Sequence, residues 1–117
     1  MAQSKYSVPQ KSVAQILQDQ RGVTKTIAHG SNLDVDLVAE QMASISFACK
    51  NGACIKAGSS NTGIVYVGLA GVTAGTEPNT DGFPLSAGDS VSIEVMDVNL
   101  IYVIASAVNQ KVFWIAS

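Results

Sequence analysis

The stretch GLAGVTAG, residues 68–75, follows an apolar run over Ile64–Val67, and glycines spaced after a strand can bind a phosphate. Such a site also needs a helix directly after the glycines and a lysine that reaches the phosphates. The chain continues as Thr-Glu-Pro-Asn-Thr-Asp-Gly-Phe-Pro, which cannot form a helix, and it contains no Gly-Lys-Ser/Thr. The context therefore predicts a loop between two strands instead of a phosphate site.

The cysteines Cys49 and Cys54 flank Lys50-Asn51-Gly52-Ala53, and Asn-Gly is a strong hairpin signal. In a two-residue hairpin the cysteines face each other, with Cβ atoms about 4.5–5.5 Å apart. A disulfide needs about 3.5–4.5 Å, so it stays possible at the limit of that geometry. The N-terminus lacks a secretory signal, which predicts a reducing cytosol and favours free thiols over a disulfide. A zinc site ranks third, since zinc takes at least three protein ligands and the chain has one histidine.

That histidine, His29, is the only imidazole that can activate a cysteine or serine nucleophile. It lies in Ala28-His29-Gly30-Ser31-Asn32, which predicts a polar surface turn, and nothing in the sequence brings it near a cysteine.

The carboxylates Asp34 and Asp36 share one face of a predicted strand, but calcium binding and acid–base chemistry both need more converging groups. Asp89, Glu94 and Asp97 are likewise expected to be solvated. We therefore expect a protein that is not an enzyme and that binds no metal or cofactor.

The elements that carry these residues are short strands. Apolar and alternating runs separated by turn residues lie at 23–27, 34–38, 42–49, 54–57, 64–67, 90–95, 100–105 and 111–115. About eight short strands without long helices are typical of an antiparallel β-sandwich or barrel. We predict an all-β fold, an antiparallel β-sandwich with jelly-roll-like connections.

The first 33 residues differ from the rest of the chain. Ser7 and Pro9 can start a short helix, Val13, Ile16 and Leu17 follow at helical spacing, and Gly22 can end it. Its narrow apolar stripe makes such a helix marginal in water unless it packs on the body or on a neighbouring subunit. The predicted organisation is an N-terminal arm over residues 1–33 and a β-sandwich body over residues 34–117.

Charged residues are few, and they are unevenly distributed along the chain. Charged residues make up 14% of the 117 residues, against roughly 25% in typical soluble domains. The arm carries four basic residues and one acid, a net charge of +3, and the body carries three lysines and eight acids, a net charge of −5. A basic arm can dock on an acidic neighbour, including another copy's body, or can simply be solvated. The cations are too few and too scattered for nucleic-acid binding, and no apolar run is long enough to cross a membrane.

Residues 42–117 carry a pattern of strands and turns: VYVG at 65–68, GVT at 71–73, GFPLSAGDSVSIEV at 82–95, LIYVIAS at 100–106 and KVFW at 111–114. This pattern resembles small all-β structural proteins of tailed-bacteriophage virions, namely capsid decoration or cement proteins, head fibres and some tail components. The resemblance implies a structural protein of the virion, assembled in the host cytoplasm.

The resemblance implies most directly a decoration protein that binds and stabilises the outer capsid shell, as a dimer or trimer in contact with the major capsid protein. We expect the contacts to come from the arm and from the long loop, whose apolar residues otherwise cap one end of the sandwich. The candidate contact residues are Tyr6, Val13, Ile16, Leu17, Leu69, Val72 and Phe83. The alternatives are a head-fibre or tail adaptor that contacts host glycans and, behind both, a small jelly-roll enzyme or metal protein.

Overall fold

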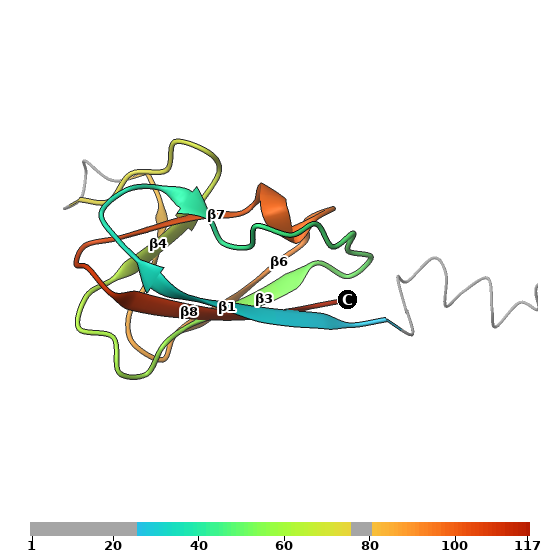
Figure 1. Ribbon diagram of the computed structural model, residues 1–117, viewed down its shortest axis with the longest axis horizontal. Helices are drawn as coiled ribbons and strands as arrows, with labels where there is room; N and C mark the ends of the chain where they lie inside the picture. Colours follow the sequence, from blue (N-terminus) through green and yellow to red (C-terminus); the bar gives the residue numbers. More distant parts are fainter. Residues whose placement is uncertain (1–25, 76–80) are drawn as a thin grey trace, which may run out of the picture.

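Two antiparallel sheets of four strands pack face to face in the computed structural model, which describes residues 26–75 and 81–117 (Figure 1). The strands are β1 (Ala28–Val35), β2 (Glu40–Gln41), β3 (Ala53–Ala57), β4 (Val65–Gly68), β5 (Phe83–Leu85), β6 (Ser90–Ile93), β7 (Tyr102–Ala105) and β8 (Gln110–Ala116), with a 3-10 turn η2 (Val98–Leu100) before β7.

The strand order is β1-β8-β3-β6 in one sheet, here sheet A, and β2-β7-β4-β5 in the other, sheet B. Every connection except the one from β4 to β5 crosses from one sheet to the other. Eight strands joined in this way form a jelly roll. The predicted fold class is therefore confirmed.

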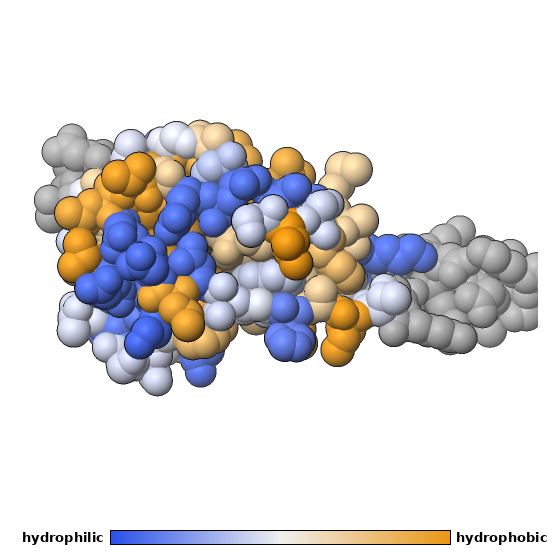
Figure 2. Space-filling model, viewed as in Figure 1, coloured by the Kyte–Doolittle hydropathy of each residue, from blue (hydrophilic) through white to orange (hydrophobic). Residues whose placement is uncertain are grey.

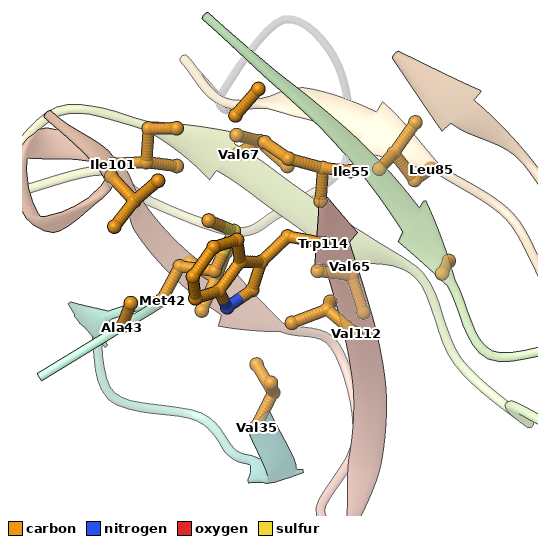
Figure 3. Packing of buried hydrophobic residues seen from close by; sticks show 14 of the residues in the cluster. Val35, Met42, Ala43, Ile55, Val65, Val67, Leu85, Ile101, Val112 and Trp114 are labelled. Carbon is orange, nitrogen blue, oxygen red and sulfur yellow. The ribbon is translucent and has the colours of Figure 1, made fainter. Parts of the chain in front are cut away.

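The core follows from the period-two alternation of the strands. Along β8, Val112, Trp114 and Ala116 are buried, whereas Phe113 and Ile115 between them face solvent. The buried side chains of sheet A meet those of sheet B, and Figure 3 shows Trp114 packed among them. The sandwich therefore has an apolar interior between its two sheets, to which β8, one of the two inner strands of sheet A, contributes three buried side chains.

Strand β1 differs from the prediction. A turn was expected at residues 28–32 and a strand at 34–38, but residues 28–35 form one strand and residues 36–39 a bend. The segment AHGSNLDV has little apolar periodicity, and pairing with β8, from Ala28 opposite Ala116 onward, makes it a strand. His29 is thus an exposed strand residue and not part of a turn. The sandwich begins before residue 34, within the range expected to be the arm.

The prediction of a strand at 42–49 and a hairpin at Asn51-Gly52 is also wrong. Residues 42–49 are irregular apart from one bridge between Ala48 and Asp97. Gly52 does adopt a positive φ of 85°. The turn there closes on the C-terminus, because the carbonyl of Ser117 accepts from the N–H groups of Lys50 (2.8 Å) and Asn51 (2.7 Å). Strand β3 pairs with β6 and β8, so Cys54 lies opposite Ser92 and Ile115 and not opposite Cys49.

The other predicted strands of the body are confirmed within a few residues, as β3, β4, β6, β7 and β8. Strand β5 was not predicted, because three residues with a central proline carry little strand signal. It pairs with β4 at the edge of sheet B, a position that proline tolerates. The predicted helix and most of the strand at 23–27 lie outside the described residues. No helix among the described residues is long and apolar enough to span a membrane.

Candidate functional site

The segment that joins β4 to β5, here the end loop, is taken to include Phe83, the first residue of β5, and is described over residues 69–75 and 81–83. It starts with a turn in which Val72 N–H donates to the Leu69 carbonyl (3.0 Å) and Gly71 has a φ of 87°. A positive φ suits glycine, so the glycine pattern serves a turn, as the sequence context indicates. No helix begins in the described part of the loop.

Side chains at both ends hold the end loop in place. The Asp81 carboxylate accepts from the backbone N–H of Thr73 (2.8 Å) and from its hydroxyl (2.9 Å). These hydrogen bonds hold the pKa of Asp81 below its ordinary value. The Tyr66 hydroxyl donates to the Gly75 carbonyl (3.0 Å). The described parts of the loop are therefore tied both to each other and to sheet B.

The three candidate contact residues of the loop divide into two groups. Leu69 and Phe83 are 76% and 56% exposed, so their apolar side chains are available to a partner. Val72 is only 6% exposed and packs with Tyr66 and Ile104, so it supports the loop from inside. The remaining candidates, Tyr6, Val13, Ile16 and Leu17, lie outside the described residues.

The outer face of sheet A also presents apolar side chains, which the sequence analysis did not single out. Phe113 and Ile115 of β8 are exposed at the centre of this face, and Ile27 is exposed at its border. Ile27, Ile115 and the partly buried Cys54 line a shallow depression of about 280 Å³. Figure 2 shows apolar residues interleaved with hydrophilic ones on the side of the molecule that it views. This surface is suited to contact with another protein more than to holding a small molecule.

A larger hollow lies along one side of the sandwich. This side groove, with a volume of about 430 Å³, is lined by residues 29–33 of β1, by residues 40–45 and by Trp114. It lies where the β1 edge of sheet A faces the β2 edge of sheet B. Glu40 is the one acid among the described residues that line it, and it accepts a hydrogen bond from Asn32 Nδ2 (3.2 Å).

The groups that could do chemistry are dispersed over the described residues. Cys49 and Cys54 are both free thiols. Burial, followed by the nearby Asp97 charge, raises the pKa of Cys49, which makes its thiol less reactive. Within the described ranges no three histidine, cysteine or acidic side chains converge as a metal site would require.

Among the acids in the described ranges, Asp97 has the largest set of close partners. Its carboxylate accepts from Asn99 N–H (3.0 Å), from the Ser46 hydroxyl and from Phe47 N–H (3.1 Å). These bonds lower its pKa and join the irregular segment 42–49 to the start of η2. All of its partners are structural, so Asp97 holds the fold together.

The arrangement thus offers a fixed end loop with apolar side chains, an apolar outer sheet face and a side groove, all of them surfaces for binding. No family model, no curated protein and no solved structure matches this chain, so these surfaces are the basis on which its function can be argued.

Proposed function

We propose that this protein is a non-enzymatic structural component of a tailed-phage virion, a decoration protein that binds the outer capsid shell and holds neighbouring capsid subunits together. The observation that carries the proposal is the end loop, which presents Leu69 and Phe83 to solvent on a backbone pinned by Asp81. A rigid apolar contact loses less conformational entropy on binding than a flexible one.

The composition of the surface supports the same role. Twelve large apolar side chains are exposed among the described residues. The same part of the chain holds three lysines and seven acids. Several exposed apolar groups on one small domain are typical of proteins that pack against others. The resemblance of residues 42–117 to virion proteins points to the shell as that partner.

The repeated binding sites of a capsid shell would make such weak contacts effective. A capsid shell offers the same site many times, and each bound copy that bridges two subunits adds buried area between them. Weak contacts become strong together when several of them engage at once. The decoration protein would in this way raise the resistance of the shell to pressure from inside.

The experiment is a binding assay on capsids that lack the protein, with Leu69→Arg and Phe83→Arg tested against Leu100→Arg. Leu100 is also exposed, but it lies in η2 and not in the end loop. We expect the two loop variants to lose at least tenfold in affinity and the control to bind as the wild type does. Equal binding by all three variants would overturn the role of the loop.

Copy number separates decoration from the alternatives. Quantitative mass spectrometry of purified virions should find hundreds of copies per particle if the protein covers the shell. A dozen copies or fewer would place it at a vertex or in the tail, and absence from the virion would refute the proposal as a whole.

A further inference from the structure

The turn that leads into β3 contains Asn51 and Gly52, and the fold requires a glycine at the second of these positions. Gly52 has a φ of 85°, and a Cβ at this position would collide with the Ile93 carbonyl oxygen. A residue with a side chain therefore does not fit there. Asn51 before it is exposed. The fold thus keeps an exposed asparagine directly before a glycine, and this is the only Asn-Gly pair in the sequence.

This pair of residues is suited to an intramolecular reaction. Asparagine is chemically labile, because the main-chain nitrogen of the next residue can attack its side-chain carbon. A glycine at the next position has no side chain to hinder that attack. The N–H of Gly52 donates no hydrogen bond to the described residues, so no acceptor holds the attacking nitrogen.

The side chain of Asn51, in contrast, is held by the end of β8. Its Nδ2 donates to the Ser117 hydroxyl (3.0 Å), and its backbone N–H donates to the Ser117 carbonyl (2.7 Å). The N–H of Lys50 donates to the same carbonyl (2.8 Å). For the reaction, Asn51 Cγ must turn toward the Gly52 nitrogen, and the hydrogen bond to the Ser117 hydroxyl opposes that rotation.

We propose that Asn51 is a site of spontaneous deamidation, and that its contact with the Ser117 hydroxyl sets the rate. The Gly52 nitrogen loses its proton to solvent and attacks Asn51 Cγ. A bond forms between the two atoms, the bond from Cγ to Nδ2 breaks, and Nδ2 leaves as ammonia with a proton from solvent. The product is a succinimide ring between the two residues.

Water then opens the ring at one of its two carbonyl carbons, and the ring nitrogen regains its proton. Opening at Cγ gives aspartate at position 51 with the normal main chain. Opening at the α-carbonyl carbon gives isoaspartate, in which the main chain runs through the former side chain. Water is the only co-reactant, and no group is oxidised or reduced.

Isoaspartate changes this corner of sheet A in two ways. It adds one methylene to the main chain between residues 51 and 52, while the Gly52 carbonyl accepts from the Ser117 N–H (3.3 Å) and Gly52 packs against Ile93. The added length displaces the N–H groups of Lys50 and Asn51 from the Ser117 carbonyl. The reaction also places a carboxylate beside the outer-face depression, which Asn51 and Ser117 help to line. It therefore loosens the end of β8 and makes the outer face more acidic.

The test uses the full chain without capsids, so its outcome is independent of the decoration proposal. The protein is incubated at pH 7 and at pH 9, and isoaspartate is located by peptide mass spectrometry. We expect conversion at Asn51 and release of ammonia, both severalfold faster at pH 9, where the Gly52 nitrogen loses its proton more readily. Asn61 also donates through Nδ2 to a carbonyl, that of Lys111 (2.9 Å), but a threonine follows it, so it should stay intact.

The Asn51→Gln variant, which would have to form a larger ring, should show no conversion at this position. Location by residue also separates Asn51 from Asp81-Gly82, which reaches the same ring by loss of water. An Asn51 that stays intact while the urea-unfolded chain converts completely would overturn the proposal, and so would equal conversion at Asn51 and Asn61.

Two serine variants test the role of the Ser117 hydroxyl. Ser117→Ala removes the acceptor of Asn51 Nδ2 but keeps the main-chain contacts, and it should speed conversion severalfold. Ser86→Ala is the control, at an exposed serine whose hydroxyl has no hydrogen bond with the described residues, and it should convert as the wild type does. Melting temperatures confirm that both variants are folded. Equal rates in the two variants would refute control by Ser117.

The effect on the fold is tested against Asn51→Asp, which carries the new charge on a main chain of normal length. This variant should melt close to the wild type, whereas the isoaspartate form, separated by ion exchange from the incubated protein, should melt lower. An isoaspartate form as stable as Asn51→Asp would contradict the proposed loosening of β8.

Discussion

At the scale of single residues, Asp97 organises the most irregular part of the described chain. Residues 42–49 lack strand pairing except at Ala48, yet Met42 and Ala43 are buried and Phe47 packs against the core. The Asp97 carboxylate supplies acceptors for this segment and for the start of η2 at once. A carboxylate that accepts several hydrogen bonds is favoured in its charged form, which explains its lowered pKa.

Replacement of Asp97 by asparagine should lower the melting temperature at neutral pH, because the charged acceptor is lost. A lowered folded-state pKa means that the ionised carboxylate stabilises the fold above the ordinary carboxyl pKa of about 3.9. This contribution is lost as the pH falls through the lower folded-state value. The gap in melting temperature between wild type and Asp97→Asn should therefore stay constant from pH 7 to about pH 4 and narrow below it.

Circular dichroism melts at several pH values measure this gap. The matched control is Asp34→Asn, at an exposed carboxylate that accepts no hydrogen bond from described residues. It should show little change at any of these pH values. A gap for Asp97→Asn that widens in acid would contradict the assigned role.

At the scale of elements, β8 is one of the two inner strands of sheet A. It pairs with β1 on one side and β3 on the other, and its two faces have different surroundings. Ile55 of β3 lies opposite Trp114 with 0% exposure, whereas Ile115 of β8 faces solvent at 51%. Sheet A thus contains one buried and one exposed isoleucine, at which the effect of the same substitution can be compared.

Ile55→Ala should destabilise the fold by about 2–5 kcal/mol, since it removes buried methyl groups and leaves a cavity. Ile115→Ala should stay within about 0.5 kcal/mol, because its side chain is already half in water. Urea unfolding followed by circular dichroism gives both values. Similar losses in both variants would show that the outer face is covered in solution.

The sequence predicts the inner strands well and the edges poorly, for a physical reason. The inner strands β3 and β8 bury alternate side chains, and the inner strands β4 and β7 are almost wholly apolar, so their patterns are visible in the sequence. Of the edge strands, β6 alternates clearly enough to be predicted. Strand β1 lies at an edge, and AHGSNLDV gains its strand form from pairing with β8, which no local pattern reveals. The segment MASISFAC is apolar enough for a strand, but its Phe47 and Cys49 N–H groups bond to Asp97 and Met96 instead.

At the scale of the whole molecule, the jelly roll places strands side by side that lie far apart in the chain. The first strand pairs with the last, and β3 pairs with β6 and β8. Long-range pairing of this kind slows folding, because loops must close before contacts form.

Of the candidate sites, the exposed part of the end loop could be anticipated from its apolar residues. The side groove could not, since it joins β1, residues 40–45 and Trp114 through the fold alone.

Because the strands of this fold pair over long distances in the chain, we expect the protein to refold from urea in about milliseconds to seconds. Stopped-flow fluorescence of Trp114 reports core formation directly, because it is the single tryptophan and is buried. Minor phases of tens of seconds from proline isomerisation can be separated by double-jump experiments. A main phase of microseconds would be at odds with a fold of this topology.

The position of β8 between β1 and β3 bears finally on how the protein is made. A ribosome delivers β8 after the seven other strands of the sandwich. Until β8 has left the exit tunnel, β1 and β3 have no strand between them, and sheet A is incomplete. A nascent chain therefore exposes the facing edges of β1 and β3 through most of its synthesis, and the sandwich closes only when its last strand emerges.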